Sequence, residues 1–286
     1  MKRKLESVSK RIEYADKRYL VLYIVLRLFV IAMMILEFFQ KNYDHVFTCA
    51  LTLVLFLIPA IVDKKFNIKL PTAMECIILL FIFAAEILGE IQGFYLIFPH
   101  WDTILHTING FLMAAIGFSM IDILNQSPRF HINLSPVFVA FVAFCFSMTI
   151  GVLWEFFEYS MDTFAHTDMQ KDTICETISS VNLHPDGVNV PVVVEKIQYT
   201  QIQATVDGEA KEIVIPNGYM DLGLQDTMDD LLVNLIGAAV FSVIGAIYIK
   251  NRGKGRFVLS LIPRMKTPAE IAQTEQINKS REEEDQ

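Results

Sequence analysis

Hydrophobic residues along the chain gather into six runs, each long enough to cross a membrane as a helix. A helix needs about 20 apolar residues to span roughly 30 Å of hydrocarbon. The six runs are residues 20–39, 45–62, 73–98, 101–123, 136–159 and 226–249. The pattern therefore predicts an all-α polytopic membrane protein with six transmembrane helices.

Basic residues indicate the orientation of these helices, because lysine and arginine concentrate in the cytoplasmic segments of membrane proteins. They lie in the N-terminal segment, in the connections after the second and fourth runs, and after the sixth run. Residues 165–225, after the fifth run, instead contain nine acidic and three basic residues. We therefore predict that both termini are cytoplasmic and that residues 165–225 lie outside.

The long segment between the fifth and sixth runs carries a β pattern. VPVVVEKIQYTQIQATV and EAKEIVI flank Asp207-Gly208, a dipeptide typical of a type I′ hairpin turn. We expect a small extracytoplasmic β-hairpin insertion here. The predicted organisation is a basic cytoplasmic segment (1–19), transmembrane helices 1–5 (20–164), the insertion (165–225), transmembrane helix 6 (226–250) and a polar cytoplasmic tail (251–286).

Composition agrees with a membrane protein and excludes one class of partner. Hydrophobic residues make up 53% of the 286 residues, including 22 phenylalanines, and the mean hydropathy is +0.41. These values are too apolar for a soluble domain of this size. The net charge of −8 comes from the insertion and the REEED tail, so it gives no support to nucleic-acid binding.

Charged residues inside the spans are unexpected, because each costs about 2.5–3.5 kcal/mol on insertion scales. With the predicted orientation they fall in the outer halves of four helices, and several share a helix face through spacings of three, four or seven residues. These residues, with two asparagines that share their helix faces, are Glu86 and Glu90; Asp102, His106 and Asn109; Glu155 and Glu158; and Asp226, Asp230 and Asn234. We predict that these polar faces enclose an outward-facing acidic and histidine pocket.

A divalent metal ion is one ligand that such a pocket would suit. Carboxylate and imidazole donors from Asp102, His106, Glu155, Glu158 and Asp230 would form a mixed oxygen and nitrogen shell. Glu86, Glu90, Asn109, Asp226 and Asn234 would line the pocket around it. In a hydrolase, His106, Asp102, Glu155 and Glu158 would be the catalytic candidates. The alternative is that the deeper acids are protonated and hydrogen-bonded between helices.

Glycines in the spans suggest close contacts between helices. Small residues at a helix interface let two backbones approach. Gly110, Gly117, Gly151, Gly237 and Gly245 are therefore expected to serve packing rather than chemistry.

Three motifs, WDTILH, GVLWEFFEYSMD and DTMDDLLVNLIGA, resemble the YjdF-like family of bacterial inner-membrane proteins, a domain-of-unknown-function group. This resemblance implies a multi-pass location in the bacterial plasma membrane. More distantly, Asp102-x3-His106, Glu155 and Asp230-x3-Asn234-x2-Gly237 are similar to VanZ-like proteins, implicated in glycopeptide resistance. Glu158 stands where VanZ-like proteins tend to have glutamine, and the insertion is extra.

Three functions are compatible with these patterns. The first is a metal-assisted hydrolase acting on a lipid or another cell-envelope component. The second is an ion-coupled or proton-coupled transporter, in which Glu86 and Glu90 bind the cation. The third is a structural or regulatory membrane subunit whose β insertion binds a partner.

Overall fold

The computed structural model describes residues 17–65, 68–125, 134–250 and 260–272. Among these residues, six helices are long and apolar enough to cross a membrane: Tyr19–Gln40, Tyr43–Asp63, Thr72–Ile91, Trp101–Asn125, Pro136–Ala165 and Leu224–Lys250. The prediction of six spans is confirmed. The chain divides into two compact units, residues 1–151 with 233–286, and residues 152–232. The predicted basic segment, residues 1–19, lies largely outside the described residues.

The first unit begins with a helical hairpin. Helix α2 (Lys17–Gln40) is followed by Lys41 in the left-handed conformation (φ 65°), by α3 (Tyr43–Leu55) and by α4 (Ile58–Lys65). The second span is interrupted between α3 and α4 next to Pro59, which has no N–H to donate within a helix. Buried Glu37 fastens the hairpin by accepting hydrogen bonds from Asn42 Nδ2 (2.7 Å) and His45 Nδ1 (3.1 Å).

The third span is shorter than the hydrophobic run predicted. Helix α5 (Thr72–Phe83) continues into a π-helix, η1 (Ala84–Ile91), and then ends. Gly93 (φ 68°) turns the chain into the one-turn helix α6 (Phe94–Ile97). A glycine just beyond a helix end takes this conformation without steric cost. The prediction that the span reaches residue 98 is therefore wrong, and Glu90 lies at the end of the span rather than inside it.

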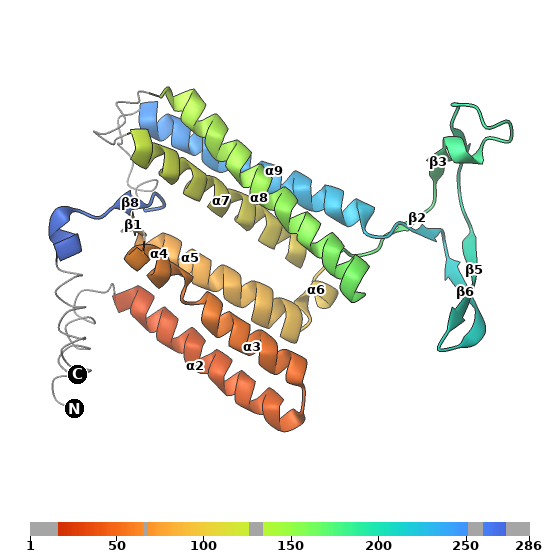
Figure 1. Cartoon of the computed structure of the whole chain (residues 1–286), viewed down its shortest axis with the longest axis horizontal. Helices are drawn as coiled ribbons and strands as arrows, with labels where there is room; N and C mark the ends of the chain where they lie inside the picture. Colours follow the sequence, from red (N-terminus) through yellow and green to blue (C-terminus); the bar gives the residue numbers. More distant parts are fainter. Residues whose placement is uncertain (1–16, 66–67, 126–133, 251–259, 273–286) are drawn as a thin grey trace. The chain divides into compact units, whose positions relative to one another are not determined.

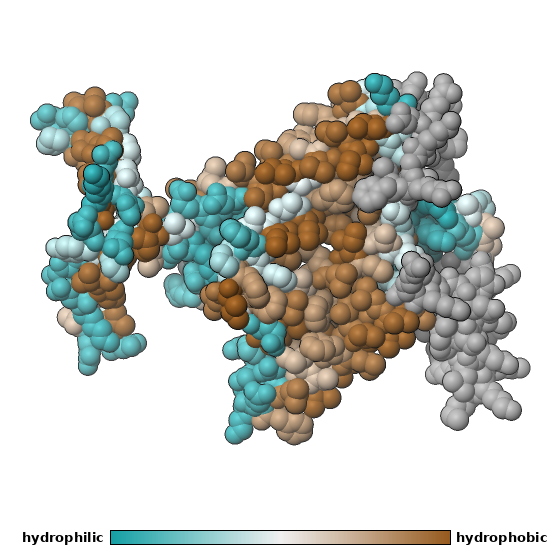
Figure 2. Space-filling view, turned by 180° about the vertical axis from the view of Figure 1, so that it is seen from behind, coloured by the Kyte–Doolittle hydropathy of each residue, from teal (hydrophilic) through white to brown (hydrophobic). Residues whose placement is uncertain are grey.

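Three further helices complete the spans: α7 (Trp101–Asn125), α8 (Pro136–Ala165) and α9 (Leu224–Lys250). In the first unit, one apolar core joins α5 and α7 to the parts of α8 and α9 that belong to this unit, with Phe118 and Phe241 fully buried in it. A second core, around Val30, Phe56 and Leu79, joins α2 and α3 to α5 (Figure 1). The face of the helices seen in Figure 2 is mainly hydrophobic. Such a surface suits contact with lipid.

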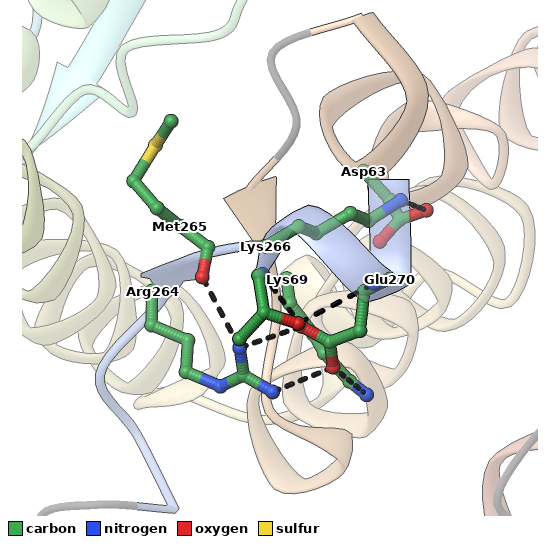
Figure 3. A network of polar contacts seen from close by, with 7 residues as sticks. Asp63, Lys69, Arg264, Met265, Lys266 and Glu270 are labelled. Carbon is green, nitrogen blue, oxygen red and sulfur yellow. Dashed lines mark hydrogen bonds and ion pairs between the residues drawn. The ribbon is translucent and has the colours of Figure 1, made fainter. Parts of the chain in front are cut away.

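Part of the predicted polar tail, residues 251–286, packs onto this unit. Leu261 and Ile262 are buried in the first core, and β8 (Arg264–Met265) pairs antiparallel with β1 (Ile68–Lys69). Lys266 Nζ donates a 2.7 Å hydrogen bond to Asp63 Oδ2 (Figure 3). Residues 260–272 of the predicted tail thus make both apolar and polar contacts with this unit.

Glu270 is the centre of the polar contacts in Figure 3. Its carboxylate accepts two hydrogen bonds from the Arg264 guanidinium (2.8 and 2.9 Å) and one from Lys69 Nζ (3.0 Å). Thr267 donates to it through its backbone N–H (2.8 Å) and its hydroxyl (3.0 Å), a capping box at the start of the next helical turn. The Arg264 guanidinium, followed by the Thr267 N–H, lowers the pKa of the Glu270 carboxyl far below its usual range.

The second unit contains three pairs of antiparallel strands between the ends of α8 and α9. The pairs are β2 (Ile174–Cys175) with β7 (Tyr219–Met220), β3 (Ile178–Ser180) with β4 (Val192–Val194), and β5 (Tyr199–Val206) with β6 (Glu209–Pro216). A 3₁₀ turn, η2 (Val181–Leu183), follows β3. Asp207 and Gly208 both have positive φ, 55° and 82°, as a type I′ turn requires. The predicted β-hairpin is present.

Candidate functional site

Three carboxylates from two helices meet in the second unit. Glu155 and Glu158 are three residues apart on α8 and share a helix face, while Asp230 belongs to α9. One oxygen from each lies within 4.8 Å of the others. All three side chains are buried, with relative exposures of 4%, 6% and 3%. We call these residues the carboxylate triad.

Glu158 has a hydrogen-bond donor on its own helix. Trp154 Nε1 donates a 2.8 Å hydrogen bond to Glu158 Oε1, one helical turn further along α8. A hydrogen bond to a carboxylate oxygen restricts the rotamer of the side chain. Trp154 therefore acts on the triad as a positioning residue.

Three carboxylates this close repel one another strongly when all are ionised. Helix α8 contains no lysine or arginine, and α9 contains none before Lys250. The only lysine or arginine residues in the sequence of the second unit are Lys171, Lys196 and Lys211. Lys171 forms an ion pair with exposed Asp168. Bound protons or a bound cation would reduce the repulsion, and oxygen donors at these separations could share a metal ion.

Two other acids near the ends of α8 and α9 have a structural role. Asp162 Oδ1 accepts hydrogen bonds from Thr167 Oγ1 and the Met169 N–H (both 2.7 Å), and its Oδ2 accepts one from the Gln170 N–H (2.8 Å). Asp226 Oδ2 accepts the next backbone N–H, that of Lys171 (2.8 Å). Asp226, predicted to line the pocket, thus helps to fasten the loop after α8.

Sequence reasoning missed two residues that complete this loop. Gln170 is buried and hydrogen-bonds through Nε2 to Thr227 Oγ1 on α9. Asp221 accepts backbone hydrogen bonds from Thr173, Gly223 and Gln225. Burial opposes ionisation of Asp221, but these N–H donors outweigh it and lower the pKa of its carboxyl. An aspartate just before a helix start is a recognisable capping signal, and could have revealed this role.

Other predicted site residues lie in the first unit. On α7, His106 is buried and its Nε2 lies 3.5 Å from Asp102 Oδ1. One turn further, Asn109 Nδ2 donates a 3.4 Å hydrogen bond to Oδ1 of Asn234 on α9. Asn234 is fully buried, and its Nδ2 lies 3.5 Å from Met148 Sδ on α8. Asn109 and Asn234 therefore form a polar contact between helices.

The two glutamates of the third span lie on the π-helix η1, also in the first unit. Glu86 is half-buried and Glu90 is exposed. The structure thus brings Glu155, Glu158 and Asp230 together in one unit, and Asp102 and His106 together in the other. The sequence also predicts that Asp102 and His106 share one pocket with the carboxylate triad, Glu86 and Glu90. This stays a prediction.

Comparison with known proteins supports the membrane assignment. Residues 22–181 match a family described as "Predicted membrane protein (DUF2238)". The match includes Asp102, His106, Glu155 and Glu158 and ends before Asp230. No significant match was found among curated proteins or solved structures, and no comparison supports the VanZ-like resemblance. Because the family match covers more than half of its length, the chain belongs to the DUF2238 family of predicted membrane proteins.

Proposed function

We propose that this protein is a YjdF-like multi-pass protein of the bacterial plasma membrane that binds a divalent metal ion through Glu155, Glu158 and Asp230. The observation that carries the proposal is the proximity of three buried carboxylates, with one oxygen of each within 4.8 Å of the others. A divalent cation would neutralise most of their charge and use oxygen donors of a kind that hard metal ions prefer.

The reaction we propose is hydrolysis of a lipid or a lipid-linked envelope component. Along α8, Glu155 lies ten residues before Ala165, and along α9, Asp230 lies six residues after Leu224. At 1.5 Å per residue these positions are roughly 15 and 9 Å from the helix ends. In a membrane, this depth is close to the headgroup region, where an ester or phosphoryl group could reach the ion. A bound metal would polarise that group and lower the pKa of a coordinated water.

Metal content tests the proposal directly. Purified protein loaded with Mg²⁺, Mn²⁺, Zn²⁺ or Ca²⁺ and then desalted should retain close to one ion per chain by elemental analysis. Glu155→Gln and Asp230→Asn should lose it, while Asp168→Asn, which neutralises an exposed acid of the same unit, should keep it. Retention of no ion by the wild type would rule out the metal site and favour shared protons.

The predicted participation of Asp102 and His106 has a separate spectroscopic test. Cu²⁺ placed in the site would show nitrogen hyperfine coupling in its electron paramagnetic resonance spectrum if an imidazole coordinates it. The coupling should disappear in His106→Asn and persist in His166→Asn, which changes a histidine beyond α8. A spectrum without nitrogen coupling in the wild type would restrict the site to oxygen ligands.

A transporter is the second candidate, favoured by one specific feature. Glu86, inside the third span, and Glu90, at its end, both lie on the π-helix η1, and π-helical segments occur frequently at functional sites. Cation or proton flux in proteoliposomes that disappears with Glu86→Gln and persists with Glu155→Gln would favour transport. Absence of flux for every ion tested would remove this candidate.

A further inference from the structure

The hairpin β5–β6 forms a sheet of only two strands. Within the described residues, β5 pairs with β6 alone, from Tyr199 opposite Pro216 to Val206 opposite Glu209 (Figure 1). An isolated two-stranded hairpin is marginally stable in water. A third strand along either edge would add backbone hydrogen bonds and cover exposed side chains, among them Ile202 and Ile213.

The two edges of the hairpin differ in their protection. Strand β6, EAKEIVIP, carries Glu209, Lys211 and Glu212 and ends in Pro216. Charged residues and proline are the usual means by which proteins block an exposed strand edge. Strand β5, YTQIQATV, contains no charged residue and no proline over eight positions. The edge of β5 is therefore open to strand addition.

The type of turn determines which backbone N–H and C=O groups of β5 point outward from the open edge. In a hairpin with a two-residue turn, the flanking pair, Val206 and Glu209, is hydrogen-bonded, and this state alternates along the strands. Val206, Ala204, Ile202 and Thr200 thus direct their backbone N–H and C=O groups toward β6. The outward backbone groups belong to Tyr199, Gln201, Gln203 and Thr205.

We propose that the strand added to this edge is β5 of a second copy of the chain. An antiparallel pairing about a two-fold axis at Ile202 places Tyr199 opposite Thr205 and Gln201 opposite Gln203 of the other copy. All four outward-facing residues of each strand are then paired. In this register odd-numbered residues lie opposite odd-numbered residues, and even-numbered opposite even-numbered. The apolar faces of the two hairpins therefore lie on the same side of the sheet.

The absence of charged side chains from β5 suits pairing with the same strand of a second copy, although residues 165–225 as a whole are acidic. Residues 165–225 carry nine acids and three bases, so two copies repel one another over most of this segment. The uncharged strand β5 offers a place where they can meet without opposed carboxylates. A basic peptide would be attracted mainly to the acidic residues of this segment. These residues lie on β6 and in the loops, so a basic peptide has no charged partner along β5.

The pairing buries little area, since seven residues of each strand meet edge to edge. A stable complex between soluble proteins usually needs about 1,200 Å² or more. Both copies are confined to one membrane, however, and confinement raises their effective concentration. A four-stranded sheet, β6–β5–β5–β6, would be the outcome.

Cysteine cross-linking tests the register. Ile202 would face Ile202 of the other copy as a non-hydrogen-bonded pair, with Cα atoms about 4.5 Å apart, within the range for a disulfide. In a Cys175→Ser background, Ile202→Cys in native membranes should give a disulfide-linked dimer under mild oxidation. Ile213 lies opposite Ile202 on β6, so two copies of it would be about 14 Å apart. Ile213→Cys is therefore the matched control, with at least tenfold less dimer expected.

Gln203→Pro provides a second test, because it removes an outward N–H without removing a hydrogen bond to β6. The dimer from Ile202→Cys should fall at least tenfold when Gln203→Pro is added. An intramolecular disulfide in an Ile202→Cys, Ile213→Cys variant carrying the same proline reports that the hairpin is intact. Equal cross-linking at positions 202 and 213, or cross-linking at 202 that survives the proline in an intact hairpin, would overturn the proposal.

Discussion

Gly110 of α7 and Asn234 of α9 meet backbone against backbone: a β-carbon on Gly110 would lie 2.2 Å from the Asn234 carbonyl oxygen. One turn further along α9, a β-carbon on Gly237 would lie 2.1 Å from the carbonyl oxygen of Thr107. The Gly110 carbonyl oxygen accepts a 2.7 Å hydrogen bond from Ser147 of α8. The two glycines thus allow α7 and α9 to approach closely while α8 bonds to the same point, as their positions in the sequence predicted.

Gly110→Ala should destabilise the helical unit, because the new methyl group overlaps backbone that cannot move independently of α9. Overpacking typically costs about 1–3 kcal/mol, and a clash with backbone belongs at the upper end. Thermal unfolding in detergent, followed by the fluorescence of a thiol-reactive dye, would measure the loss. Met120→Ala, which shortens an exposed side chain on the same helix, should change the midpoint little. Equal midpoints for the two variants would contradict the packing argument.

Asp162→Asn should loosen the loop after α8 while leaving the triad residues in place. The amide nitrogen cannot accept, so at least one of the three hydrogen bonds from Thr167, Met169 and Gln170 is lost, each worth about 1.5–3 kcal/mol to a charged acceptor. Trypsin cleavage after Lys171, measured by mass spectrometry, should become several-fold faster. Asp168→Asn is the control, since it changes a more exposed carboxylate in the same loop. Faster cleavage in the control alone would refute the role of Asp162.

The spans were predictable because hydrophobicity is additive along a helix, whereas their ends depend on single residues. The run from Ala73 to Phe98 is apolar throughout, and only the left-handed Gly93 separates the π-helix η1 from α6. A window average cannot register one backbone dihedral angle. The sequence likewise placed Asp226 of α9 in one pocket with Glu155, Glu158 and Asp230. The structure separates Asp162 and Asp226, which accept backbone hydrogen bonds, from the buried triad.

Contacts between distant segments were not predictable from local patterns. Lys266 and Asp63 are 203 residues apart, and neither lies in a motif that indicates the other. The Thr267-Pro-Ala-Glu270 sequence does carry a local signal, a capping box with proline at the first helical position. That signal predicts a helix start in the tail. The pairing of β8 with Ile68 and Lys69 has no such local signal and is seen only in the structure.

Asp63→Asn should destabilise the packing of residues 260–272, because it removes the carboxylate charge that lies 2.7 Å from the Lys266 ammonium, a group only 5% exposed. Removing one member of a partly buried ion pair costs about 1–3 kcal/mol. Lys69→Gln breaks an ion pair whose lysine is 52% exposed, and should cost about 0–1 kcal/mol. Hydrogen exchange of residues 260–272 would show greater loss of protection for Asp63→Asn. The reverse order would contradict the difference in burial.

The contacts of Glu270 should persist in mild acid and fail in strong acid. Arg264 and Thr267 lower the pKa of this carboxyl in the folded protein, so its contribution to stability is complete above the ordinary glutamate pKa, about 4.3, and is lost as pH falls through the lower folded value. Protection of residues 264–270 from hydrogen exchange should be constant between about pH 7 and 5. It should decline only below about pH 4, and Glu270→Gln should abolish this dependence. A decline centred near pH 6 would point to another group.

Trp154→Phe should weaken metal binding by the triad without abolishing it. The change keeps an aromatic ring but removes the N–H that donates to Glu158 Oε1, so the carboxylate gains rotational freedom that metal binding must then restrict. Loss of an orienting hydrogen bond of this kind typically weakens metal affinity by about 10- to 100-fold. Isothermal titration with the ion retained by the wild type would measure the change.

Phe157→Leu is the control for this prediction. It alters the ring that packs against Trp154, at a centroid separation of 5.4 Å, without changing a carboxylate. It should leave the affinity within about threefold of wild type. If both variants bind the metal equally weakly, aromatic packing rather than the hydrogen bond orients Glu158.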